Sequence, residues 1–185
     1  MISAPVLFTE RLMLRPPLPE DIDGFTEFYG DPQTMHFLGG SPLSRAEAYR
    51  SMCMYAGAFA LSGVSMFSVI ERASDKWIGR LGPWSPEGWP GTEVGWGLVR
   101  SAEGKGFATE ATIAAMDYAV DVLGWTRIIH TIDPENAASI ALAKRLGSSN
   151  LGPTHLPAPF ADKAVDAWGQ TSGHWRTNRR NVARR

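Results

Sequence analysis

The sequence lacks the features that mark disulfide-bonded, metal-binding or disordered proteins. Its 185 residues include a single cysteine, Cys53, so no internal disulfide can form, and its four histidines are scattered rather than grouped with cysteines as a structural zinc site requires. We therefore expect no metal ion, and a reducing, cytoplasmic setting. A composition of 44% hydrophobic and 20% charged residues is ordinary for a globular protein and excludes disorder as the main state.

The sequence also lacks a convincing membrane span. Residues 51–70 carry no charge, but serines dilute the segment and Gly63 separates a helix-like half from a half rich in strand-forming residues. We predict a buried helix followed by a buried strand, and no contact with a membrane. Cys53 lies in the apolar helix without a neighbouring base, which predicts a buried structural residue rather than a nucleophile.

Positive charge is scarce except at the end of the chain. The net charge is -1, yet five of the last ten residues are arginines, so the remainder of the chain carries -6 by difference. These arginines are Arg176, Arg179, Arg180, Arg184 and Arg185. We interpret residues 176–185 as a basic C-terminal tail in solvent, in preference to a nucleic-acid-binding segment.

The spacing of apolar residues predicts one mixed α/β domain over residues 7–175, without repeats or linkers. Strands are predicted at 11–15, 64–71, 77–84, 92–100, 127–132, 150–156 and 164–171, and helices at 19–30, 44–61, 105–123 and 136–146. The segment from 92 to 132 forms a central βαβ unit. Ser44 and Glu47 form a capping box at the start of the second helix.

Two glycines, Gly104 and Gly106, join the predicted strand 92–100 to the helix that follows it. Backbone N–H groups exposed at a helix start form an anion site, most naturally for a phosphate or pyrophosphate, although a turn that merely needs positive φ is an alternative. A nucleotide P-loop does not fit, because Lys105 is followed by glycine. A dinucleotide fingerprint does not fit either, because Thr109 stands at its third position.

Five short motifs follow one another along the chain. They are Thr9-Glu-Arg-Leu-Met-Leu-Arg-Pro16, Asp31-Pro-Gln-Thr-Met35, Glu93-Val-Gly-Trp96, Glu103-Gly-Lys-Gly-Phe-Ala-Thr-Glu-Ala111 and Pro134-Glu-Asn-Ala-Ala-Ser139. In this order they resemble the GNAT superfamily of N-acetyltransferases, and within it the branch of ribosomal-protein N-terminal (alanine/serine) acetyltransferases. Three positions depart from the family pattern. Glu103 replaces an Arg or Gln, Ala143 stands where many members carry a general-acid tyrosine, and Ser148-Ser149 replaces a phenylalanine.

The resemblance implies a GNAT-like α/β fold, with a mixed, mostly antiparallel sheet of about six or seven strands flanked by about four helices. It implies acetyl-CoA as co-substrate, with its pantetheine along strand 92–100 and its pyrophosphate on the glycine turn. The implied cofactor-binding residues are Leu98, Val99, Gly104, Lys105, Gly106, Phe107, Ala108, Thr109, Asn136 and Arg145.

The implied reaction is direct attack of a primary amine on the thioester in a ternary complex. Glu93 is the candidate base, which would take the proton directly or through water, with a strand-start glutamate in solvent or in a salt bridge as the alternative. Because Ala143 cannot protonate the thiolate, we assign that role to Ser139, helped by Asn136, although Asn136 also suits a helix N-cap. The oxyanion would meet a backbone N–H near Leu98.

The sequence leaves the acceptor open between a protein N-terminal α-amine and a small-molecule amine. It also leaves open a non-catalytic acyl-CoA-binding module, and whether the protein is a monomer or a homodimer. The tryptophans of this region suit either an acceptor pocket or the core, and most are expected in the core. Trp89, between Gly88 and Pro90, is the one expected to be exposed.

Overall fold

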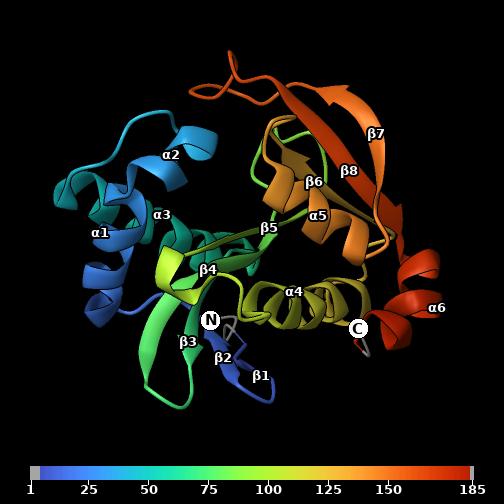
Figure 1. Ribbon diagram of the computed structural model, residues 1–185, viewed down its shortest axis with the longest axis horizontal. Helices are drawn as coiled ribbons and strands as arrows, with labels where there is room; N and C mark the ends of the chain where they lie inside the picture. Colours follow the sequence, from blue (N-terminus) through green and yellow to red (C-terminus); the bar gives the residue numbers. More distant parts are fainter. Residues whose placement is uncertain (1–4, 184–185) are drawn as a thin grey trace. The chain divides into compact units, whose positions relative to one another are not determined.

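The computed structural model describes residues 5–183, which form eight strands and six α-helices (Figure 1). In chain order the elements are β1 (Leu7–Phe8), β2 (Leu12–Arg15), η1 (Pro19–Asp21), α1 (Ile22–Gly30), α2 (Pro32–Leu38), α3 (Arg45–Ser62), β3 (Phe67–Glu71), β4 (Lys76–Trp84), β5 (Glu93–Leu98), η2 (Arg100–Ala102), α4 (Phe107–Asp117), the π-helical η3 (Tyr118–Val122), β6 (Arg127–Ile132), α5 (Ala137–Arg145), β7 (Ser149–Thr154), β8 (Val165–Thr171) and α6 (Ser172–Val182). The predicted α/β class is confirmed.

The predicted element counts, about six or seven strands and about four helices, were too low. The additional strand is β1, whose two residues pair antiparallel with β2. The additional helices are α2 and α6. Helix α2 begins directly after α1, where the sequence analysis predicted only the end of a helix at residue 30. The Asp31 carboxylate accepts a hydrogen bond from the Thr34 N–H at 2.7 Å, so Asp31 ends one helix and caps the next, with Pro32 at its first position.

The sheet is mixed and mostly antiparallel, with the strand order β1-β2-β3-β4-β5-β6-β8-β7. Strands β1 to β4 pair antiparallel in sequence order, and β8 pairs antiparallel with both β6 and β7. Strand β5 is parallel to β6, with Glu93 opposite Ile129. This parallel pair with α4 between its strands is the predicted βαβ unit.

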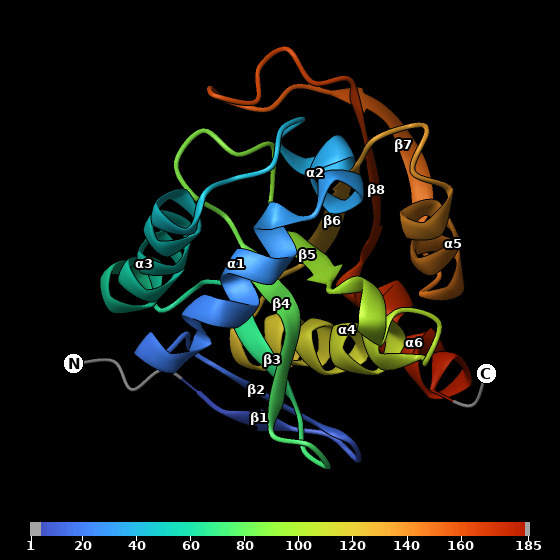
Figure 2. The same ribbon diagram turned by 60° about the vertical axis from the view of Figure 1, so that its left-hand side comes forward.

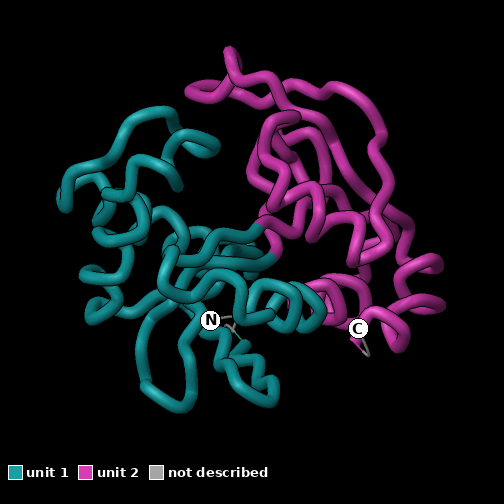
Figure 3. Tube along the Cα trace, in the orientation of Figure 1, with its two compact units in different colours: residues 1–82, 96–114 teal, residues 83–95, 115–185 magenta. Residues whose placement is uncertain are grey.

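The chain divides into two compact units, which share β4, β5 and α4 between them (Figure 3). Unit 1 comprises residues 1–82 and 96–114, and unit 2 comprises residues 83–95 and 115–185. The predicted domain, residues 7–175, therefore contains parts of both units.

The core of unit 1 lies where α1 and α3 pack beside the first strands, as the turned view shows (Figure 2). Its largest fully buried side chains include Leu12, Leu14, Phe25, Phe28 and Phe67. Helix α3 carries the predicted capping box at Ser44 and Glu47 and ends at Gly63, which has a φ of 73°. The charge-free segment is thus a helix followed by the buried strand β3, but the helix is buried on one face only, with Met54 and Leu61 exposed, so the prediction of a buried helix was wrong for its outer face. In the part of the chain that the structure describes, no helix has the length and apolarity needed to cross a membrane.

Cys53 is exposed on α3, which corrects the prediction of a buried cysteine. The helix turns Met52, Tyr55 and Phe59 into the core, and Cys53 lies one position outside that stripe. Because α3 carries no charge from Ser51 onward, the sequence did not reveal which face of this part of the helix is buried.

Unit 2 builds its core on β6, β8 and the helices α5 and α6. Helix α6 is anchored by Trp175, which is completely buried and donates a hydrogen bond from its indole Nε1 to Asp117 at 2.9 Å. Val182, seven residues later on the same helix face, is also buried. These two apolar contacts hold α6 in place.

The predicted solvated tail is therefore wrong for residues 176–182, which belong to α6. Arg179 pairs with Asp117 at 2.8 Å and also with Asp121, and Arg176 pairs with Asp121 at 3.3 Å. The arginines alone gave no sign of these partners. Asp117 and Asp121 lie one helical turn apart and face the arginines only in the folded chain. Arg184 and Arg185 lie outside the described residues.

Candidate functional site

The glycine turn of unit 1 has the backbone conformation that the sequence predicted. Gly104 and Gly106 have φ values of 71° and 81°, in the left-handed region that glycine adopts without strain. A Cβ at Gly104 would meet no atom within 4 Å, so conformation rather than space requires the glycine. The residues from Gly104 to Gly106 are exposed.

Helix α4 starts directly after this turn. A hydrogen bond from the Glu110 N–H to the Gly106 carbonyl at 3.1 Å marks its first turn, and the amides of Phe107 and Ala108 precede that bond. Amides at a helix start lie where the helix dipole favours negative charge. The turn therefore suits a phosphate group, and the main chain supplies the donors.

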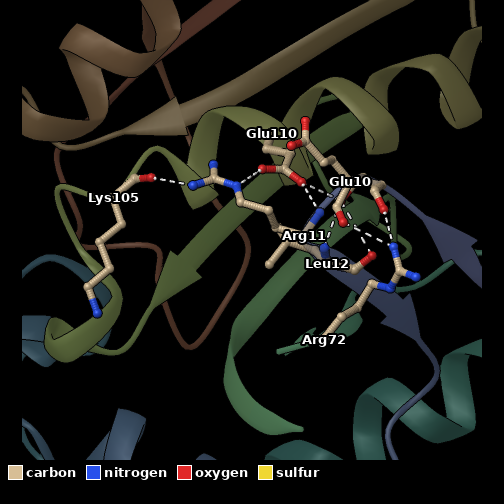
Figure 4. Close-up of polar contacts among 7 residues, drawn as sticks. Glu10, Arg11, Leu12, Arg72, Lys105 and Glu110 are labelled. Atoms are coloured by element: carbon tan, nitrogen blue, oxygen red, sulfur yellow. Dashed lines mark hydrogen bonds and ion pairs between the residues drawn. The ribbon is translucent and has the colours of Figure 1, made fainter. Parts of the chain in front are cut away.

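An ion pair that the sequence analysis did not predict fixes the turn against the start of β2 (Figure 4). The Arg11 guanidinium contacts the Glu110 carboxylate at 2.6 Å, donates to the Lys105 carbonyl at 3.0 Å, and lies 4.6 Å above the Phe107 ring. The Thr9 hydroxyl also donates to Glu110, at 2.6 Å. The turn is thus held through the Lys105 carbonyl.

Glu110 stays ionised in this arrangement. Partial burial acts to raise its pKa, but hydrogen bonds from Thr9 and Arg11 outweigh burial and lower the pKa below its ordinary value. Arg11 and Glu110 both belong to motifs that the sequence analysis singled out, but they are 99 residues apart in the chain. No spacing rule connects them.

At the end of β5, in unit 1, the side chains are buried, so the backbone is the part of the strand that a ligand could contact. Leu98 and Val99 are both buried, and the Val99 N–H donates to the Ile78 carbonyl at 2.9 Å. The chain packs closely here, since a Cβ at Gly97 would lie 2.5 Å from the Phe28 ring. A ligand along β5 would therefore meet main-chain groups.

A small cavity of about 100 Å³ lies beside Val99 in the same unit. It is lined by Glu27, Phe28, Asp31, Thr34, Val99 and Arg100. Two carboxylates and one guanidinium give this cavity mixed charge.

In unit 2, Glu93 is buried, with 5% of its surface exposed, and its carboxylate is well supplied with donors. Oε1 accepts hydrogen bonds from the backbone N–H and the hydroxyl of Thr131, both at 3.0 Å, and Oε2 accepts one from the Trp89 indole. The alternative of a strand-start glutamate in solvent is thereby excluded. Trp89 is half-buried rather than exposed as expected, because its indole is tied to Glu93 and it contacts Trp84 edge-on.

Side chains replace one backbone rung between β5 and β6. The Ile129 N–H donates to the Thr92 carbonyl at 3.0 Å, and the next rung of a regular parallel ladder would join the Thr131 N–H to the Val94 carbonyl. Instead, the Thr131 N–H donates to Glu93, and the Val94 carbonyl accepts from Nδ1 of His130 at 2.7 Å. The two strands are thus connected by side chains at this level.

His130 is the centre of a buried polar chain that the sequence analysis did not detect. Its Nε2 lies 3.1 Å from the Ser148 hydroxyl, which accepts a hydrogen bond from the Gln170 amide at 3.1 Å. Because a carbonyl can only accept, Nδ1 carries the proton and Nε2 accepts from Ser148. Burial lowers the pKa of His130 to about 4, so its imidazole is neutral at physiological pH.

Helix α5 carries the remaining candidates, also in unit 2. Asn136 caps the helix by accepting from the Ser139 N–H at 3.0 Å, which confirms its structural role. Ser139 is half-buried in the first turn, and Arg145 is exposed in the last. Ala143, at the position where many GNAT members carry a tyrosine, is completely buried.

The structure thus distributes the candidates between the two units. Unit 1 contains Leu98, Val99, Gly104, Lys105, Gly106, Phe107, Ala108 and Thr109, whereas unit 2 contains Glu93, Asn136, Ser139 and Arg145. Among the described residues, no group of three or more His, Cys, Asp or Glu side chains is placed to hold a metal ion.

The model of the acetyltransferase (GNAT) domain family matches residues 11–149. That range contains the glycine turn, β5, β6 and α5, and it is most of the chain. The protein therefore belongs to the GNAT acetyltransferase family.

The chain is similar to an uncharacterized N-acetyltransferase, p20, from Bacillus licheniformis, with 33% identity over 79% of this chain and 83% of that protein. Among solved structures, an acetyltransferase from Agrobacterium tumefaciens shares 28% identity at a TM-score of 0.78, covering 92% of this chain and 96% of the other. A ribosomal L7/L12 α-N-protein acetyltransferase shares the fold at 16% identity, with a TM-score of 0.74, over 90% of this chain and 94% of the other.

Proposed function

We propose that this protein transfers an acetyl group from acetyl-CoA to a primary amine by direct attack in a ternary complex. The observation that carries the proposal is the exposed turn at Gly104 and Gly106, which presents helix N-terminal amides in a chain of the GNAT family. The single, exposed cysteine agrees with a cytoplasmic setting, and we propose that the protein acts there as a monomer or homodimer.

In this proposal the pyrophosphate of acetyl-CoA binds the amides from Gly104 to Thr109, with Lys105 and Arg145 as phosphate contacts. The pantetheine arm follows the backbone at Leu98 and Val99. Support comes from the turn's geometry and from Arg11, which fixes the Lys105 carbonyl and so orients the opposite, amide side of the turn. Glu103, the acidic departure from the family motif, is exposed and need not oppose binding through main-chain amides.

Catalysis begins from a neutral amine. At pH 7 an α-amine with a pKa of about 8 is roughly 10% neutral, whereas a lysine amine with a pKa of about 10.4 is roughly 0.04% neutral. The amine nitrogen bonds to the thioester carbonyl carbon, and Glu93 accepts the amine proton through water, since its carboxylate is buried. A backbone N–H near Leu98 stabilises the oxyanion.

The carbon–sulfur bond then breaks, and Ser139, which Asn136 orients, relays a proton from solvent to the CoA thiolate, while the proton that Glu93 accepted returns to solvent. Buried Ala143 offers no proton, so another residue of α5 must take the part that a tyrosine plays in many family members. The hydrogen bond from the Ser139 N–H to the Asn136 side chain, which caps the helix, keeps Ser139 in a fixed position in the first turn.

Two acceptor classes have support. The similarity in fold to the ribosomal L7/L12 α-N-protein acetyltransferase favours a protein N-terminus. The cavity beside Val99 instead offers the carboxylates of Glu27 and Asp31 to a small amine, with the Arg100 guanidinium in the same lining. A non-catalytic acyl-CoA-binding module is the second candidate function, favoured by the buried Ala143.

A thermal-shift titration with acetyl-CoA, with adenosine diphosphate and NAD as controls, tests the proposal first. At a concentration of about 100 times Kd, linkage gives roughly 2.7 kcal/mol of stabilisation, or about 5 to 11 °C. A thiol-release assay with N-terminal peptides and small amines follows. No shift at millimolar acetyl-CoA would contradict the proposal, and a shift without thiol release for any acceptor would support the binding module.

A further inference from the structure

The connection between β5 and β6 at Val94 is unusual because it depends on an imidazole. Strands in a regular ladder lie about 4.8 Å apart and join through backbone groups. Here the side chain of His130, from β6, donates from Nδ1 to the Val94 carbonyl on β5 at 2.7 Å. The Glu93 carboxylate satisfies the Thr131 N–H that would otherwise bond to Val94. An imidazole and a carboxylate thus stand in the place of one rung.

The imidazole is held in a single orientation by groups from two other segments. The Ser148 hydroxyl donates to Nε2, and the Gln170 amide donates to Ser148 at 3.1 Å and to the Leu146 carbonyl at 3.0 Å. His130, Ser148 and Gln170 are all buried, so rotation of any one would leave buried polar groups without partners. Nδ1 is therefore a fixed donor.

We infer that His130 is a positioning residue: by donating from Nδ1 to the Val94 carbonyl in place of a backbone rung, it keeps β5 parted from β6 at Val94 and so prepares β5 to pair with the pantetheine arm of acetyl-CoA. The inference rests on the proposed function, because β5 is the strand that follows the arm in that proposal. The role belongs to Nδ1, whereas Nε2 serves to hold the ring.

Two amide substitutions at His130 distinguish the roles of the two ring nitrogens. The side-chain nitrogen of asparagine occupies nearly the position of Nδ1, and that of glutamine nearly the position of Nε2. His130→Asn therefore keeps the donor to Val94 and loses the contact with Ser148. His130→Gln loses the donor to Val94, and its amide N–H reaches Ser148, where the hydroxyl oxygen must then accept instead of donating. Both place a neutral amide in the same buried site, so a merely structural role predicts similar effects for the two variants.

We expect His130→Asn to bind acetyl-CoA within about 3-fold of the wild type, and His130→Gln to bind at least 10-fold more weakly by isothermal titration. In thiol-release kinetics the glutamine variant should raise KM for acetyl-CoA by a similar factor and change kcat much less. Equal acetyl-CoA affinity in the two variants, whether high or low, would overturn the inference.

A measurement on the unmodified protein does not depend on how the variants fold. With ¹⁵N-labelled histidine, the NMR shifts of the His130 ring should show the Nδ1–H tautomer, and the Nε2–H tautomer would overturn the inference. Wild-type binding separates this inference from the proposed function. If the wild type binds no acetyl-CoA, the proposed function fails, whereas wild-type binding with indistinguishable variants removes the role of His130 alone.

Discussion

The glycine turn of unit 1 and the buried polar chain of unit 2 both position backbone groups, but they do so in different ways. The turn obtains its shape locally, from positive φ values at Gly104 and Gly106. The connection at Val94 draws on His130, Ser148 and Gln170, which come from different elements. The conformation of the turn therefore depends on its own two glycines, with Arg11 holding the Lys105 carbonyl from outside, whereas the connection at Val94 depends on several side chains at once.

The largest expected effect concerns Glu93. Glu93→Gln should lower kcat for thiol release on the order of 10³-fold, because the amide cannot accept the amine proton. KM for acetyl-CoA should change little, since the amide oxygen still accepts from the Thr131 N–H. Trp89→Phe is the matched control, because it removes one hydrogen bond to the carboxylate and keeps the base. Full activity of Glu93→Gln would remove Glu93 from the mechanism.

The second prediction concerns the pH dependence of stability. The folded-state pKa of His130, about 4, lies below the unfolded value of 6.5, so between these values the unfolded chain binds the extra proton. The free energy of unfolding should therefore fall as the pH drops from 6.5 to 4, by roughly 3 kcal/mol from this group. Urea unfolding of the wild type and of His130→Asn would measure it. Parallel curves for the two proteins would contradict the prediction.

The third prediction concerns the backbone conformation of the turn at Gly106. Gly106→Ala forces an L-residue to a φ of 81°, which should cost about 1–2 kcal/mol of stability and weaken acetyl-CoA binding about 10-fold. Gly57→Ala is the control in the same unit. It lies within helix α3, where a Cβ meets nothing within 4 Å, and should stabilise the protein by about 0.5–1 kcal/mol. The same sign of stability change in both variants would argue against a strained turn.

The smallest effect is expected at the exposed ion pairs of α6. The Arg179 guanidinium is the main cause of the lowered pKa of Asp121, but the aspartate side chain is 41% exposed. Asp121→Asn should therefore cost less than about 1 kcal/mol, and the cost should diminish in 1 M salt. Trp175→Ala, which removes a completely buried side chain of the same helix, should cost about 3–5 kcal/mol in thermal unfolding. Comparable losses in the two variants would show that charge, rather than packing, holds α6.

The residue pattern was sufficient to predict the elements whose signals lie close together in the chain. The capping box at Ser44, the helix end at Gly63 and the cap at Asn136 were all confirmed. The prediction failed where one sequence pattern is compatible with two structures. Asp31-Pro32 ends α1 and also begins α2, and the arginines from 176 onward suit a solvated tail as well as a helix that meets acidic partners.

By itself the sequence determined the α/β class, the glycine turn and the family, because these depend on residues within one short segment or on motifs in a fixed order. Only the tertiary structure decided that Arg11 holds Lys105, that Glu93 is buried against Thr131, and that His130 replaces a backbone rung. The reason is physical. Hydrogen bonds between distant residues leave no periodic pattern in the chain, because they form only when folding brings their partners together. At Glu93 and His130, burial also makes an unpaired polar group costly.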